Sequence, residues 1–62
     1  MTKDFLVRKK ESNTAAIEAV RLEVSTYLTD LDNPEWKWLI EPEALYGKGG
    51  WRAYGRIEWS KA

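Results

Sequence analysis

Residues 36–59, WKWLIEPEALYGKGGWRAYGRIEW, decide the fold of this chain. Two strand-like runs, residues 36–46 and 51–59, flank the segment Gly47-Lys48-Gly49-Gly50. Glycine reaches the positive φ values that a tight turn needs. The sequence therefore predicts an antiparallel hairpin whose turn is residues 47–50.

The turn also predicts which residues pair across the hairpin, beginning with Tyr46 opposite Trp51. On one face this register places the pairs Trp38–Trp59, Ile40–Ile57, Pro42–Gly55 and Ala44–Ala53. On the other face it places the pairs Glu41–Arg56, Glu43–Tyr54 and Leu45–Arg52. One register thus separates apolar from polar side chains on both strands, whereas a slip of one residue would mix them.

The residues before the hairpin predict one more strand and one helix. Residues 3–10 read as a strand, and Ser12, Asn13 and Thr14 are three successive candidates for a helix N-cap. A helix is expected over residues 14–31, because apolar residues recur there at spacings of three and four: Ile17, Val20, Val24, Tyr27, Leu28 and Leu31. Pro34 ends this segment.

Together these elements predict a single α+β domain over residues 1–62, with the order β-α-β-β. Pro42 has no N–H to donate, which favours an edge position for the second strand. A right-handed crossover through the helix makes the first and second strands parallel. The third strand then fits between them, which gives the sheet order 1-3-2 with the helix on one face.

Composition excludes several kinds of site. The 62 residues include no cysteine and no histidine, so disulfides and zinc sites built from these residues are excluded. The net charge is zero, but residues 1–10 carry four basic groups and one acid, and residues 46–62 again carry four and one. We therefore expect a local basic patch where the two ends of the chain meet. The apolar run at residues 5–7 is too short for a signal peptide, which favours a cytoplasmic protein.

Candidate catalytic groups are few. Glu41 and Glu43 lie two apart on one strand face, as a solvated pair of carboxylates would. Lys48 lies in a glycine-rich turn that lacks the length and context of a phosphate-binding loop. The sequence therefore predicts a protein that is not an enzyme and that uses no cofactor and no metal.

Two groups of residues are candidates for binding a partner. The outer sheet face, away from the helix, is expected to carry three leucines, a tyrosine and three arginines: Leu6, Leu39, Leu45, Tyr54, Arg8, Arg52 and Arg56. The inner face is expected to hold all four tryptophans beneath one helix. Because one helix covers a limited area, Trp36 and Trp51 near the strand ends are predicted to stay exposed and to contact a partner.

Three functions fit these surfaces. The first is a small protein-binding module that associates with itself or with a protein partner, as inhibitors or adaptors of phages and mobile elements do. The second is binding of single-stranded nucleic acid through Arg8, Arg52, Tyr54 and Arg56. Basic and aromatic side chains alternate along residues 52–56, a pattern that can bind phosphates and stack on nucleobases. The third is binding of a flat, flavin-like ligand by tryptophan stacking. The element order resembles that of the dodecins, and this resemblance implies a tryptophan stacked on flavin near Trp36 or Trp38.

Overall fold

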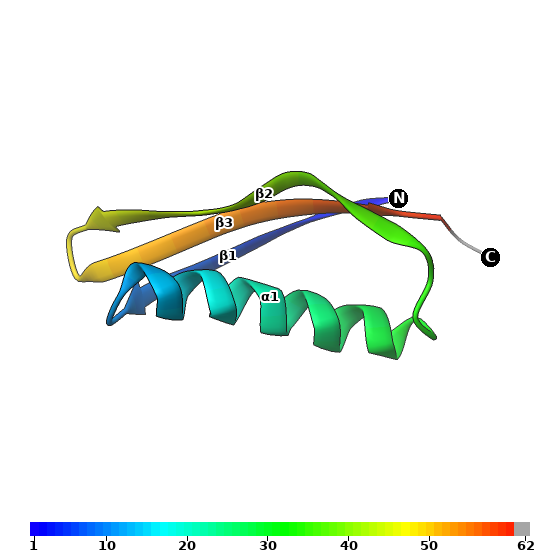
Figure 1. Ribbon diagram of the computed structural model, residues 1–62, viewed down its shortest axis with the longest axis horizontal. Coiled ribbons are helices and arrows are strands. Elements are labelled where there is room, and N and C mark those ends of the chain that lie inside the picture. The colour runs from blue at the N-terminus through cyan, green and yellow to red at the C-terminus, as the bar shows by residue number, and fades with distance from the viewer. Residues whose placement is uncertain (61–62) are drawn as a thin grey trace.

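The computed structural model describes residues 1–60 as three strands and one helix. In chain order these are β1 (Thr2–Lys10), α1 (Asn13–Asp30), β2 (Trp36–Gly47) and β3 (Gly50–Trp59). The strands form one sheet in the order β1-β3-β2, and β3 is antiparallel to both neighbours. Figure 1 shows α1 lying along one side of this sheet, with the other side uncovered. The β-α-β-β arrangement and the strand order are thus confirmed.

Both ends of α1 are capped by local hydrogen bonds. Ser12 is the N-cap, and its Oγ accepts a hydrogen bond of 3.0 Å from the backbone N–H of Ala15. At the other end, the N–H groups of Asp32 and Asn33 donate to the carbonyls of Thr29 and Leu28, at 3.1 and 2.8 Å. This Schellman pattern needs left-handed backbone after the cap, and Asp32 and Asn33 have φ values of 69° and 52°.

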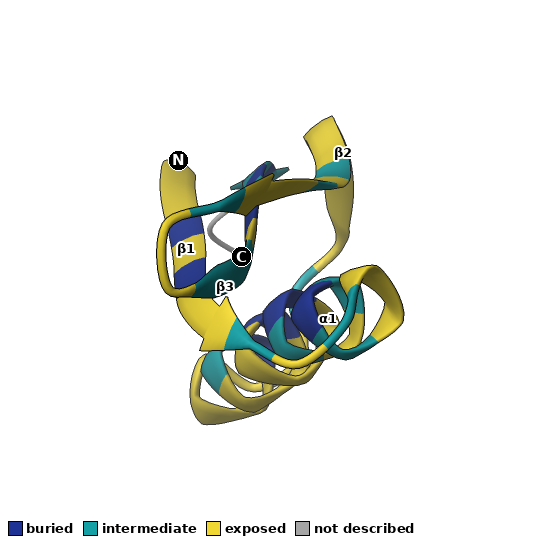
Figure 2. Ribbon diagram, turned by 90° about the vertical axis from the view of Figure 1, so that its left-hand side faces the viewer, coloured by how far each residue is buried: buried dark blue, intermediate teal, exposed yellow. Residues whose placement is uncertain are grey.

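The core lies between α1 and the β1–β3 half of the sheet (Figure 2). Its nine buried residues come from β1, α1 and β3: Phe5, Val7, Ala16, Val20, Val24, Leu28, Ala53, Ile57 and Trp59. No residue of β2 is buried to that degree, although Trp38 and Ala44 pack against the core. Leu31 was expected on the buried stripe of the helix but is 40% exposed. The reason is that it forms the C-cap, where the helical path ends.

The hairpin keeps its predicted register only near the turn. Tyr46 pairs with Trp51 there, and the pairs Leu45–Arg52, Ala44–Ala53 and Glu43–Tyr54 are also as predicted. Farther from the turn the register shifts twice, between Glu43 and Ile40 and again between Ile40 and Trp38. The observed pairs are Ile40–Arg56, Trp38–Ile57 and Trp36–Trp59. The predicted pairs Trp38–Trp59, Ile40–Ile57, Glu41–Arg56 and Pro42–Gly55 are therefore wrong.

The physical reason for the shifts lies in Pro42 and Gly55. Pro42 cannot donate to the ladder, and bulges are where a sheet tolerates proline. Gly55 has no side chain, and the space that a Cβ would occupy is taken by the ring of Trp38, whose Cζ3 lies 3.1 Å from that point. Each shift inserts one extra residue in β2, so the two together restore the alternation and return Trp38 and Trp36 to the α1 side. Between them, Ile40 lies opposite Arg56, on the outer face.

Candidate binding surfaces

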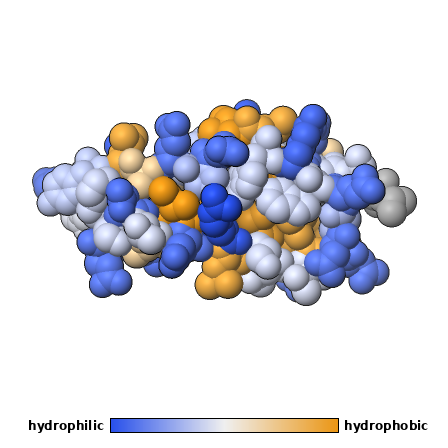
Figure 3. Space-filling view, in the orientation of Figure 1, coloured by the Kyte–Doolittle hydropathy of each residue, from blue (hydrophilic) through white to orange (hydrophobic). Residues whose placement is uncertain are grey.

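The outer face of the sheet is an uncovered surface with a row of exposed aliphatic side chains. Leu6 on β1 pairs with Tyr54 and is 46% exposed, and Leu45 on β2 pairs with Arg52 and is 61% exposed. Leu39 and Ile40, at the register shifts of β2, are also exposed. Figure 3 shows apolar surface along the rim formed by the sheet, interrupted by hydrophilic side chains. Within residues 1–60, no second layer covers this face of the sheet (Figure 1).

A hydrogen-bonded group lies in the middle of this face. The guanidinium of Arg56 donates to both carboxylate oxygens of Asp4, from Nε and from Nη2, and the Tyr54 hydroxyl donates to the same carboxylate at 3.1 Å. The hydrogen bond from Arg56 lowers the pKa of Asp4 below its ordinary value of 3.8, and the bond from Tyr54 adds to this effect. Asp4, in turn, raises the pKa of Arg56. Arg56 and Tyr54 are therefore engaged within the chain.

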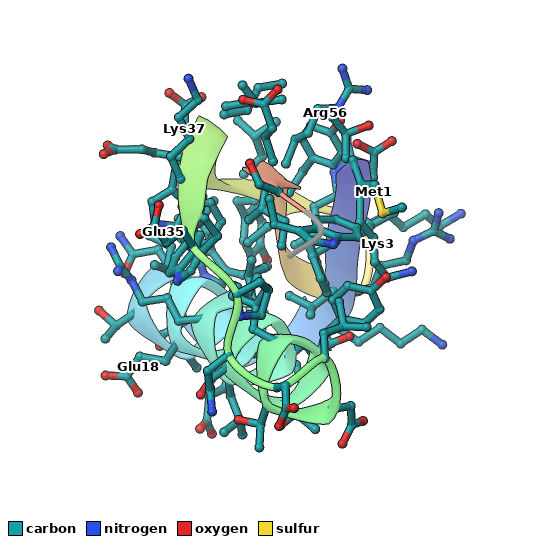
Figure 4. All side chains as sticks on the ribbon, turned by 90° about the vertical axis from the view of Figure 1, so that its right-hand side faces the viewer. Met1, Lys3, Glu18, Glu35, Lys37 and Arg56 are labelled. Atoms are coloured by element: carbon teal, nitrogen blue, oxygen red, sulfur yellow. The ribbon has the colours of Figure 1, made fainter. Side chains whose placement is uncertain are left out.

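A second ion pair lies on the same face, toward the chain termini. Lys37 Nζ is 3.4 Å from Glu58 Oε2, and the two residues are direct partners across β2 and β3. Figure 4 shows Lys37 and Arg56 on the side of the sheet away from α1. Four charges of the outer face are thus neutralised in pairs, whereas Glu43, opposite Tyr54, takes part in neither ion pair.

The hairpin end of the molecule has a different character. Arg8, Lys9, Lys48 and Arg52, together with Gly47 and Gly50, line a hollow of about 260 Å³. We call it the basic hollow. The two ion pairs that the structure shows among residues 1–60 involve Arg56 and Lys37, and none of these four basic side chains. The expected meeting of basic residues from both parts of the chain therefore occurs here.

The tryptophans all occupy positions on the α1 side of the sheet, with different degrees of exposure. Trp59 is buried against Tyr27, with ring centroids 5.3 Å apart, whereas Trp36 is 42% exposed. Trp38 lies edge-on to Trp36 at 5.2 Å, and the guanidinium of Arg21 lies 6.0 Å from the Trp38 ring. Trp51 is half-buried beneath Tyr46, which is itself 74% exposed. Of the two tryptophans predicted to be exposed, Trp36 is the more accessible.

A groove lies beside these rings, where the sequence-based hypothesis stacks a flat ligand on tryptophan. Trp36, Trp38 and Arg21 line it with residues of α1, and its volume is about 200 Å³. Small-molecule sites usually enclose about 300–1,000 Å³. A larger hollow of about 710 Å³ lies at the terminal end, between Tyr27, Pro34 and Trp59. It borders Ser60, the last described residue.

The predicted binding residues do not form one site. Leu6, Leu45 and Tyr54 lie together on the outer face, while Arg8 and Arg52 border the basic hollow. Trp36 and Trp51 lie on the α1 side, toward opposite ends of β2 and β3. Sequence reasoning missed Ile40, which the shifts of register move to the outer face, and Lys9, and it interpreted Lys48 as part of a plain turn. The runs Arg8-Lys9-Lys10 and Gly47–Gly50 were the signals for the latter two.

Comparison of the chain with protein-family models, with curated protein sequences and with solved structures found no match. Within residues 1–60, no helix is long and apolar enough to cross a bilayer. The same part of the chain shows no cluster of three or more acidic, histidine or cysteine residues that could hold a metal ion.

Proposed function

We propose that this protein is a small protein-binding module that associates with a second copy of itself through the outer face of its sheet. The observation that carries the proposal is the uncovered face with the exposed aliphatic residues Leu6, Ile40 and Leu45, next to exposed Leu39 in the register shift. A sheet normally buries each apolar face against another layer. Here α1 covers one face only, so a second copy of the chain can supply the second layer.

The size of the face suits a pair of copies. β3 has 10 residues, so at usual strand spacings the face is roughly 33 Å long and about 14 Å wide. Two such faces in contact cover on the order of 1,000 Å² of surface, which is close to the lower limit for specific interfaces. The face is therefore large enough for a modest, reversible dimer.

The charges favour a second copy over a strongly charged partner. The net charge of the chain is zero, so two copies do not repel each other at long range. In the centre of the face Arg56 is already paired with Asp4, and Lys37 is paired with Glu58. Two identical faces can therefore meet with these four charges already paired, and the other charges opposite Tyr54 and Leu45, Glu43 and Arg52, are of opposite sign. The proposed role is binding without catalysis, since the shifted pKa values belong to an exposed ion pair.

Molecular mass in solution tests the proposal. The chain has a mass of 7.2 kDa, and light scattering between about 1 µM and about 1 mM should show a rise toward twice that mass. Leu45→Glu places a charge on the outer face and should keep the protein monomeric. Leu22→Glu is the matched control, because Leu22 is 68% exposed on α1 and lies outside the proposed contact.

Two results would overturn self-association. One is a monomer throughout the concentration range, which would leave the face to a different protein partner. The other is a Leu45→Glu variant that associates as strongly as the unmodified chain while Leu22→Glu does not. Circular dichroism of both variants shows whether each is folded, so that a change in mass is not caused by unfolding.

A further inference from the structure

Basic residues are concentrated at the hairpin end of the molecule. Residues 8–10 and 47–52 carry five basic residues and no acid. The register of β1 against β3 shifts by one residue between Val7 and Lys10. Within this shift Lys9 has a φ of 59°, a left-handed conformation that costs energy for a residue with a side chain. The structure thus keeps a strained residue at the basic hollow.

Because of this shift in register, two consecutive residues, Arg8 and Lys9, line the same hollow. Neighbouring residues of a regular strand point to opposite faces, but a bulge changes the direction of a side chain. Arg8 and Lys9 accordingly both line the basic hollow, where they meet Lys48 and Arg52 from the hairpin. Gly50 lets the turn approach closely, since a Cβ at this position would lie 2.8 Å from the Lys10 carbonyl oxygen.

Two further features of the hairpin end favour a ligand that has both negative charges and aromatic rings. Tyr46 directly precedes Gly47, is 74% exposed, and packs edge-on against Trp51 at 5.4 Å. Tyr46 lies on the α1 side of the edge strand β2, next in sequence to Gly47 of the basic hollow. A single strand that passes from the hollow around this edge can stack a base on the exposed ring. In addition, α1 begins at the same end of the molecule (Figure 1), with no acidic residue in its first turn, although Glu11 directly precedes its N-cap Ser12.

From these features we propose that the hairpin end binds single-stranded nucleic acid. The basic hollow holds backbone phosphates through Arg8, Lys9, Lys48 and Arg52, and Tyr46 stacks on a base. This differs from the sequence-based hypothesis, which used Tyr54 and Arg56, because both of those residues are hydrogen-bonded to Asp4. Lys9, Lys48 and Tyr46 lie outside the proposed dimer contact, whereas Arg52 is the cross-strand partner of Leu45, so binding is measured at protein concentrations at which the chain is monomeric.

Fluorescence anisotropy with a labelled oligothymidylate of about 12 nucleotides tests this proposal. For single strands, the logarithm of the binding constant falls with the logarithm of salt concentration by about 0.7 for each phosphate contact. Four contacts predict a slope of about −2.8, and Lys9→Gln with Lys48→Gln should reduce it to about −1.4. Extrapolated from 1 M salt, each lost contact weakens binding about eightfold at 50 mM salt.

The control for charge is Lys37→Gln, which also removes one positive charge but lies at the far end of β2. It should leave the slope unchanged. Tyr46→Ala should weaken binding by about five- to a hundredfold, the equivalent of losing one stacked base, whereas Tyr46→Phe should preserve it. Circular dichroism confirms that each variant is folded.

Several outcomes would overturn the proposal. The first is no binding of the oligonucleotide at low salt. The second is an equal loss of binding with Lys37→Gln and with the Lys9 and Lys48 variants, which would indicate an effect of total charge only. The third is binding to vesicles that contain phosphatidylglycerol but not to the oligonucleotide. Equal affinity for duplex DNA, with no effect of Tyr46→Ala, would reject the stacking.

Discussion

The ring of Trp38 lies over Gly55, with its Cζ3 only 3.1 Å from the point where a Cβ would stand. The backbone oxygen of Ile40 is 3.3 Å from the same point, and Cγ1 of Val20 is 3.5 Å from it. Trp38 therefore fills the space that the missing side chain leaves. This contact joins the bulged strand β2 to the centre of the core.

Gly55→Ala should destabilise the protein by about 1–3 kcal/mol, because the added methyl group must displace the Trp38 ring or the backbone of Ile40. Gly47→Ala is the control, because a Cβ there meets no atom within 4 Å. Urea denaturation measures both free energies of unfolding. Equal stability of the two variants would mean that Trp38 does not depend on Gly55 for its position.

At the turn, Gly50→Ala should be more destabilising than Gly49→Ala. Both glycines have positive φ values, 126° and 93°, so both substitutions strain the backbone. Only at Gly50 would the new Cβ also collide with a backbone oxygen, that of Lys10 at 2.8 Å, whereas the nearest atom to Gly49 is 3.9 Å away. The difference between their midpoints of thermal unfolding measures the close approach of the turn to β1. Identical midpoints would contradict it.

Burial in the core predicts a large effect at Ile57. Ile57 is 0% exposed, so Ile57→Ala should cost about 2–5 kcal/mol and Ile57→Val about 0.5–1.5 kcal/mol. Leu22→Ala on the exposed side of α1 should change stability by no more than about 0.5 kcal/mol. Chemical denaturation of the three variants gives the comparison, and a cost for Leu22→Ala equal to that for Ile57→Ala would argue against this core.

The N-cap of α1 predicts a selective effect at Ser12. Ser12→Ala removes the acceptor for the Ala15 N–H and should cost about 1 kcal/mol. Ser12→Asp restores an acceptor and adds a negative charge at the helix N-terminus, so it should recover that loss. Thermal unfolding followed at the helix band of circular dichroism measures both. Failure of Ser12→Asp to recover stability would show that the cap is not the cause.

Acid should weaken the contribution of Asp4 to stability. The pKa of Asp4 is lowered in the folded protein, so its bond with Arg56 stabilises the fold above the ordinary value of 3.8. That contribution is lost as the pH falls below 3.8 and through the lower pKa of the folded state. Asp4→Asn should therefore be less stable than the unmodified chain at neutral pH, and the difference should shrink in acid.

Glu41→Gln is the control for this pH dependence. It removes one carboxylate that forms neither of the two ion pairs shown among residues 1–60. Thermal unfolding of the three proteins between neutral pH and about pH 2 gives the comparison, since that range spans the titration of carboxylates. A difference for Asp4→Asn that stays constant with pH would exclude the ion pair as its source.

The alternation of side chains along the strands predicted much of the candidate site, and the predictions that failed did so for physical reasons. Exposed Leu6 and Leu45 on the outer face followed from strict alternation near the turn. The prediction that Ile40 lies on the inner face was wrong. It assumed that side chains alternate strictly along β2, but a bulge adds one residue and reverses the alternation. The partner predicted for Arg56 was Glu41, on the neighbouring strand β2, but Asp4 on β1 lies directly opposite Arg56 and takes its hydrogen bonds.

The sequence by itself determined the elements and their order, because these depend on interactions between near neighbours. Periodicity predicted α1, three successive residues including Ser12 were candidates for its N-cap, and a glycine-rich segment placed the turn of the hairpin. The tertiary structure alone decided the features that need distant residues to meet. They are the seating of Trp38 over Gly55, the pairing of Asp4 with Arg56, and the meeting of Arg8 and Lys9 with Lys48 and Arg52. Each depends on the shape and charge of groups far apart in the chain, which no local pattern contains.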